Sequence, residues 1–339
     1  MARVFVAFAV ALLAVAANAE PPEGPAREFT GRDLFGLQIA TDPQIRPDGS
    51  AVAYTRVSYD VMTDRPRPSI WLVDVATGVQ TPLITGPGSN TTPRWSPDGK
   101  RLAYVSTADE GRPQLYVQWL DAGRSSRLAE LIEAPAAVAW SNDGKSLAFT
   151  MFAPDEGAKL GEAPAKPEGA EWAKPLEIIT DITYRTDDGG YLKAGYTHVY
   201  VVSADGGVPR QVTFGAYNEA GPLAWSADDD FIYAGGNRTP NWRREPVNTE
   251  IYRISLADGA VTAVTSRDGP DAAPDVSPDG TKVAYLGYDD KLLGYQNALV
   301  YVMDRDGRNS RAIPAATIES RPPDSSTTAS GCASAIARG

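Results

Sequence analysis

The sequence contains very few of the residues that build disulfide frameworks and metal centres. Among 339 residues there is one cysteine and one histidine. One cysteine cannot form a disulfide within the chain, and it excludes cysteine-rich zinc or iron–sulfur sites. One histidine likewise excludes a multi-histidine metal centre. The sequence therefore predicts no disulfide framework, no metal site and no cofactor.

Basic residues are also scarce relative to acidic ones. The chain has 32 Lys+Arg against 43 Asp+Glu, which gives a formal net charge of −11. This charge repels the phosphate backbone of nucleic acids, so nucleic-acid binding is not expected as the main activity.

Long apolar runs are nearly absent as well. The one such run extends from Val4 to Ala17, shorter than the roughly 20 residues that span a bilayer. Arg3 precedes it and Ala17-Asn18-Ala19 follows, which is the pattern of an export signal at residues 1–19. We expect an exported protein, periplasmic or secreted, with no membrane span after signal cleavage.

Glycine (31) and proline (27) are plentiful, which favours many short elements joined by turns. A turn of the form apolar/Trp-Ser-x-Asp-Gly recurs five times, with its aspartates 50, 45, 85 and 51 residues apart. In these turns, proline suits a φ near −65°, the aspartate accepts hydrogen bonds from backbone amides, and glycine provides a positive φ. The five copies are Ile45–Gly49, Trp95–Gly99, Trp140–Gly144, Trp225–Asp229 and Val276–Gly280.

Each copy is followed by an apolar strand, a second turn and further strand material, which predicts a four-stranded antiparallel meander. Four-stranded repeats of about 45 to 50 residues are typical of β-propeller blades. The sequence thus predicts an all-β fold with five recognisable blades, as an incomplete member of a roughly six- to eight-bladed ring. We expect an N-terminal extension at 20–38 and the propeller at 39–313. The long spacing predicts an insertion at 153–197 in the third blade.

Several segments resemble the propeller of prolyl-oligopeptidase-family serine peptidases, and the middle of the chain resembles the acylaminoacyl-peptidase and dipeptidyl-peptidase branch. The turn repeat alone is also similar to the Tol-associated periplasmic propeller protein. The segments that carry the resemblance are Asp33-Leu34-Phe35, Asp42 to Gly49, Ile182 to Arg185, Asp188 to Leu192 and His198 to Val202.

The resemblance implies a propeller that covers an active site and limits substrate size, while the catalytic residues lie in a hydrolase domain. This chain has no Gly-x-Ser-x-Gly nucleophile elbow, so no catalytic residue is assigned and the chain is expected to be inactive alone. His198, at the start of a predicted strand, is expected to line a strand end or funnel. We single out Tyr184 and Arg185 as candidate substrate-facing residues, because an arginine can pair with a peptide carboxylate. The alternative is an ordinary strand with a solvated surface arginine.

Two questions stay open at this stage. Residues 314–339 lose the blade pattern, which fits either a disordered tail or a truncated or frame-shifted product. In function, the chain is either the gating propeller of an exported peptidase for short peptides or a stand-alone periplasmic propeller that binds a protein partner.

The export signal makes a direct prediction. We expect the exported product to begin at Glu20, because Ala17-Asn18-Ala19 is the one good cleavage site after the apolar run. Intact-mass analysis of the exported fraction measures this, and a product that retains Met1 would refute the signal.

Overall fold

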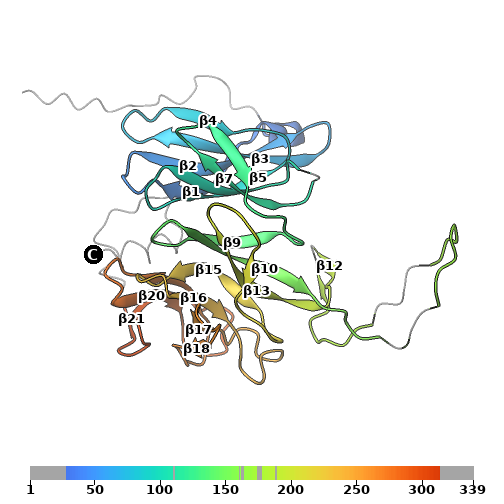
Figure 1. Ribbon diagram of the computed structural model, residues 1–339, viewed down its shortest axis with the longest axis vertical. Helices are drawn as coiled ribbons and strands as arrows, with labels where there is room; N and C mark the ends of the chain where they lie inside the picture. The colour runs from blue at the N-terminus through green and yellow to red at the C-terminus, as the bar shows by residue number, and fades with distance from the viewer. Residues whose placement is uncertain are drawn as a thin grey trace, which may run out of the picture.

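The computed structural model describes residues 28–313 except 110, 160, 162–163, 174–177 and 188. The predicted signal at 1–19 and the segment 314–339 lie outside the described residues. In the described part, one short 3-10 helix, η1 (Gly31–Gly36), precedes twenty-two strands (Figure 1). No helix in this part is long and apolar enough to cross a membrane.

Twenty of the strands form five four-stranded antiparallel sheets, which confirms the predicted blades. The first two blades consist of β1 (Ile39–Ile45), β2 (Ala51–Asp60), β3 (Arg65–Asp74), β4 (Gln80–Ile84), and of β5 (Asn90–Trp95), β6 (Arg101–Ser106), β7 (Gln114–Trp119), β8 (Arg124–Arg127). The third consists of β9 (Pro135–Trp140), β10 (Ser146–Pro154), β13 (Gly195–Ser203) and β14 (Arg210–Gln211). The last two consist of β15 (Glu219–Trp225), β16 (Phe231–Gly236), β17 (Glu250–Ser255), β18 (Val261–Ala263), and of β19 (Asp271–Val276), β20 (Lys282–Gly287), β21 (Leu299–Asp304), β22 (Arg311–Ala312).

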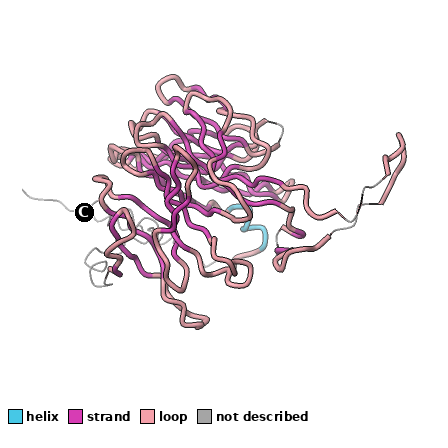
Figure 2. Tube along the Cα trace, turned by 60° about the horizontal axis from the view of Figure 1, so that its bottom comes forward, coloured by secondary structure: helices cyan, strands magenta, loops and turns pink. Residues whose placement is uncertain are grey.

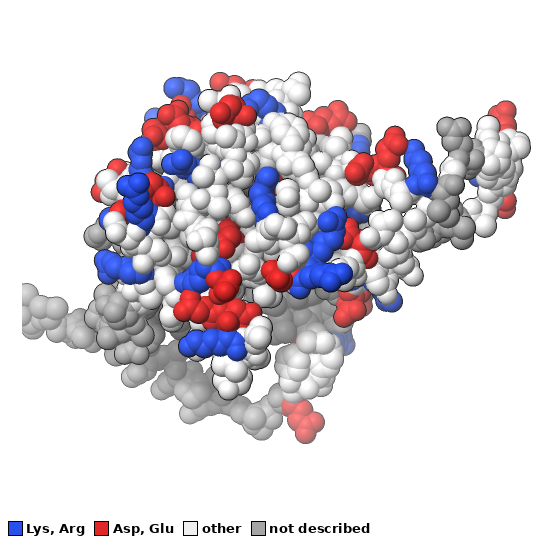
Figure 3. Space-filling model, turned by 90° about the horizontal axis from the view of Figure 1, so that it is seen from below, with Lys and Arg blue, Asp and Glu red and all other residues white. Residues whose placement is uncertain are grey.

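The blades contact their neighbours in chain order (Figures 1 and 2). Residues of their first strands β1, β5, β9, β15 and β19 line a central cavity, the channel, of about 790 Å³. Within the described residues, the first and fifth sheets make no extensive contact with each other. Acidic and basic side chains are intermingled on the face seen in Figure 3.

The apolar core consists of four clusters, one at each junction between consecutive blades. An unclosed set of blades would be expected to expose the fifth blade around Val300 to Met303. That expectation is wrong for its two end residues, since Val300 and Met303 are buried. Met303 packs with Tyr233 and Ile251 of the fourth blade, which covers this side of β21.

The turns have the predicted chemistry. Ser96 donates its hydroxyl to the Asp98 carboxylate at 2.6 Å, and Asp98 also accepts from the Lys100 amide. Gly99 has a φ of 66°, the conformation for which glycine was expected. The hydrogen bond from Ser96 is the main cause that lowers the pKa of Asp98 below its ordinary value. The turn therefore keeps its carboxylate ionised.

The tryptophans of these turns join the blades. The indole Nε1–H of Trp95 donates to the carbonyl of Gln44 at 2.9 Å, and that of Trp140 donates to the carbonyl of Arg94 at 2.9 Å. Trp225 donates in the same way to Ala139 at 3.2 Å. In each case the acceptor lies on the first strand of the preceding blade. The turn therefore holds its own blade against the preceding one.

Trp140 gives a test of this arrangement. We expect Trp140→Phe to lower the free energy of unfolding by about 1–2 kcal/mol, because the Arg94 carbonyl loses its donor while most of the apolar surface remains. The matched control is Trp119→Phe, since the Trp119 indole N–H has no protein partner among the described residues. Urea unfolding measures both, and equal losses would show that the hydrogen bond contributes nothing.

Candidate functional site

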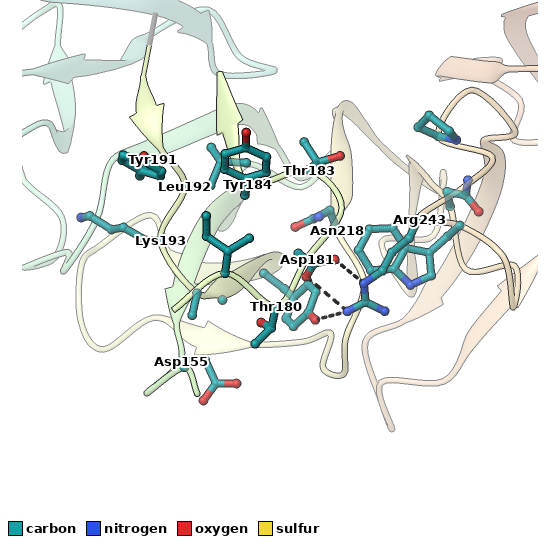
Figure 4. A pocket seen from close by; sticks show the side chains of 18 of the residues that line it. Asp155, Thr180, Asp181, Thr183, Tyr184, Tyr191, Leu192, Lys193, Asn218 and Arg243 are labelled. Carbon is teal, nitrogen blue, oxygen red and sulfur yellow. Dashed lines mark hydrogen bonds and ion pairs between the residues drawn. The ribbon is translucent and has the colours of Figure 1, made fainter. Parts of the chain in front are cut away.

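A pocket of about 740 Å³ lies between the third-blade insertion and the fourth blade (Figure 4). The insertion contributes residues around Ile178–Thr183 and Tyr191–Ala194, and the fourth blade contributes Asn218, Trp242 and Arg243. The lining combines aromatic and aliphatic side chains with a few charged ones. Such a mixture is typical of small-molecule and peptide sites.

The insertion begins and ends at one ladder. β10 pairs with β13 without a break from Ser146↔Ser203 to Pro154↔Gly195, and the insertion joins these two ends. Gly195 has a φ of 137°, and a Cβ there would lie 2.3 Å from the Ala153 carbonyl oxygen. Only glycine fits this return point.

A small hairpin inside the insertion positions its aromatic residues. β11 (Arg185–Thr186) pairs with β12 (Gly190–Tyr191), which places the Tyr184 and Tyr191 rings 6.2 Å apart. Tyr184 lines the pocket and is 46% exposed. Arg185, its neighbour among the sequence-predicted residues, is exposed and is not part of the lining.

An ion pair joins the insertion to the fourth blade. Arg243 Nε lies 2.5 Å from Asp181 Oδ1, and Arg243 also donates to the Tyr196 hydroxyl at 3.0 Å (Figure 4). The Arg243 guanidinium lies 4.4 Å from the centre of the Trp242 ring, a cation–π contact. The sequence reasoning missed these residues. Their signal was the long connection at 237–249, in a repeat whose other turns are mostly short.

A buried polar network surrounds His198, the single histidine of the chain. Its Nδ1 is 3.1 Å from Glu219 Oε2, and the Thr213 hydroxyl donates to the same oxygen at 2.8 Å. Arg238 pairs with the other oxygen of Glu219. Although a hydroxyl, an imidazole and a carboxylate meet here, Thr213 is fully buried and His198 is 4% exposed. A nucleophile must reach its substrate, and Thr213 is not accessible to one. The expected strand-end or funnel-lining place of His198 is wrong, since His198 is buried within β13.

The next blade repeats this design with two acids. The Thr265 hydroxyl donates to Glu250 Oε2 at 2.5 Å, and Arg267 pairs with Asp271. Burial is the main cause that raises the pKa of Glu250 to about 7, and the neighbouring Asp271 charge adds to it. Burial also raises the pKa of Asp271. Two buried carboxyl groups thus lie near one another, and Arg267 pairs with one of them, Asp271.

Two family models match consecutive parts of the chain. The TolB beta propeller domain model matches residues 35–154, and the model of the dipeptidyl peptidase IV (DPP IV) N-terminal region matches residues 171–289. The second match contains most of the pocket lining, from Ile178 to Thr249.

Curated relatives carry peptidase names. The chain is 28% identical over 211 residues to the "Uncharacterized peptidase YuxL" of Bacillus subtilis, which covers 62% of this chain and 31% of the relative. It is 25% identical over 272 residues to "Dipeptidyl-peptidase 5" of Porphyromonas endodontalis, with 76% and 38% covered. The chain matches the N-terminal propeller of prolyl-oligopeptidase-family peptidases. It spans about a third of the length of these two relatives.

Solved structures agree on the propeller fold. The acylaminoacyl peptidase of Pyrococcus horikoshii superposes with a TM-score of 0.62 at 17% identity, over 83% of this chain and 40% of that one. The putative TolB of Agrobacterium tumefaciens superposes with a TM-score of 0.53 at 20% identity, over 81% and 80%. The peptidase propeller and the TolB propeller are thus both relatives of this fold.

Glu250 predicts how stability depends on pH. Its carboxyl titrates near 4.5 in the unfolded chain and near 7 in the folded one, so folding favours the protonated form. The resulting stability is fully present below pH 4.5 and is lost as pH rises to about 7. We expect Glu250→Gln to raise the free energy of unfolding at pH 8 by up to about 3 kcal/mol, and to change it little at pH 4.

Urea unfolding at both pH values measures this difference. Glu130→Gln is the control, because Glu130 is exposed. A Glu250→Gln variant that is less stable at pH 8 than the unmodified chain would contradict the raised pKa.

Proposed function

We propose that this chain is the non-catalytic propeller of an exported serine peptidase that acts on short peptides. Its role is to gate access to a hydrolase domain and to select substrates by size and end group. The pocket at the third-blade insertion is the peptide-contacting surface. By itself the chain is inactive, since it carries no nucleophile elbow.

The observation that carries this proposal is the position of the pocket. Most of its lining falls within the part of the chain that matches a dipeptidyl peptidase N-terminal region, whereas the TolB-type match ends at residue 154, before the insertion begins to form the pocket. The pocket is large enough for a ligand of a few residues, and its exposed aromatic rings can stack on peptide side chains.

A second function also has support. The chain is 41% identical over 59 residues to the Tol-Pal system protein TolB of Alcanivorax borkumensis, and the putative TolB structure matches most of its length. A stand-alone propeller that binds a protein partner would use the same blades without chemistry. Peptide binding at the pocket discriminates between the two functions.

We expect the purified chain to bind unmodified peptides of about three to five residues with micromolar to millimolar affinity, and to leave them uncleaved. Tyr184→Ala removes an exposed ring from the lining and is expected to weaken binding by about three- to tenfold. Arg185→Ala tests the neighbouring sequence-predicted contact, and a smaller effect is expected because Arg185 lies outside the lining. Isothermal titration calorimetry measures the affinities.

The matched control is Tyr59→Ala, which removes an exposed tyrosine from the first blade. Tyr59→Ala should bind peptides as the unmodified chain does. If no peptide binds, or if Tyr184→Ala has no effect, the partner-binding propeller becomes the better interpretation.

A further inference from the structure

We infer that Arg243 is the receptor for a carboxylate of the bound peptide, and that Asp181 occupies this receptor when no peptide is present. The inference rests on the proposed function, because it names the chemical group that the pocket recognises. The sequence suggested Arg185 for a contact with a peptide carboxylate. The inference assigns this contact to Arg243 instead.

The Arg243 guanidinium has two contacts that do not involve the insertion. The Trp242 ring lies 4.4 Å away on one side, and the Tyr196 hydroxyl accepts a hydrogen bond from an Arg243 nitrogen at 3.0 Å. Tyr196 belongs to β13, and Trp242 contacts the Tyr196 ring edge-on at 6.2 Å. The donor geometry of the guanidinium is therefore set without the insertion, as a planar binding site for a carboxylate requires.

Asp181 is held differently. It lies in a part of the insertion, residues 178–184, that forms neither a helix nor a strand. The Asp181 and Arg243 side chains are 39% and 40% exposed. Water screens an ion pair with this exposure, so its separation costs little. A peptide carboxylate offers the same two oxygens and can take the place of Asp181.

The other basic group of the lining is already engaged. Lys193 lies 2.9 Å from Glu133, which does not line the pocket, so this pair need not change when a ligand enters. Apolar groups such as Ile178 and Leu192 line the same pocket and can contact the side chains next to the carboxylate. Arg243 is thus the cation best placed to hold the end of a peptide.

Recognition of a terminal carboxylate would also explain a preference for short substrates. A peptide has one such group. A pocket that holds it therefore fixes how far the rest of the peptide can reach from that end. An acidic side chain offers the same chemistry without measuring length, and the experiment must separate the two sources.

The test uses the full chain and matched peptides in isothermal titrations. The first pair is N-acetyl-Ala-Ala-Phe as the free acid and as the amide. The second pair is N-acetyl-Ala-Ala-Glu-amide and its Gln counterpart, which tests an acidic side chain. We expect at least a tenfold preference for the carboxylate in one of the pairs, and the pair that shows it identifies the source.

Three variants complete the design. Arg243→Gln should abolish the preference, Arg243→Lys should keep part of it as a point charge, and Asp181→Asn should strengthen carboxylate binding several-fold without changing amide binding. Circular dichroism and urea unfolding check that each variant folds.

Three outcomes would contradict the inference. If the peptides bind with no preference in either pair, the inference is overturned while the proposed function stands. Weaker binding of both members of a pair by Asp181→Asn would make Asp181 a structural brace and also overturn it. If no peptide binds at all, the proposed function fails and the inference fails with it.

Discussion

A blade of this propeller cannot cover both faces of its own sheet, so each blade depends on the one beside it. The apolar clusters at the four junctions provide most of this mutual burial, but apolar contact alone does not define an angle. The directional element is the indole hydrogen bond from the turn of one blade to the first strand of the previous one. The fifth blade has Val276 at this position, which lacks a donor, and its junction instead carries the buried Glu250–Arg267–Asp271 group. The pocket depends on this geometry because it lies across the third and fourth blades.

The fold could be predicted from the sequence because its signal is repeated. The Trp-Ser-x-Asp-Gly turn imposes the same local hydrogen bonds in several blades, so five copies reinforce one interpretation. The repeats also contain a signal for the bulges in the first strands, which the sequence analysis did not use. Positive φ angles occur at Asp42, Thr92 and Ala273, each just before a proline and each at a bulge in the first strand of its blade. Asp42 and Ala273 line the channel, but an Asp-Pro or Thr-Pro pair read singly indicates only a turn.

The candidate site could be predicted only in part, because its residues occur once in the chain and are not repeated from blade to blade. Tyr184 was found through family resemblance and does line the pocket. Asp181 and Arg243 are separated by 62 residues and meet only through the insertion. No local pattern links them. The same holds for His198 and Glu219, whose contact crosses from one blade to the next and buries the single imidazole.

The two family models match different parts of the same chain. The blades matched by the TolB model have short connections between their strands. The part matched by the dipeptidyl peptidase model contains most of the insertion and the long connection at 237–249. The insertion leaves and re-enters the third blade at one paired step, Pro154↔Gly195, where a side chain on residue 195 would clash with the backbone. A side chain at residue 195 would therefore disturb this step, while the segment between the two ends can lengthen, shorten or change its sequence without shifting the register of any blade. The side chains that the insertion contributes to the pocket can thus change while the scaffold stays the same.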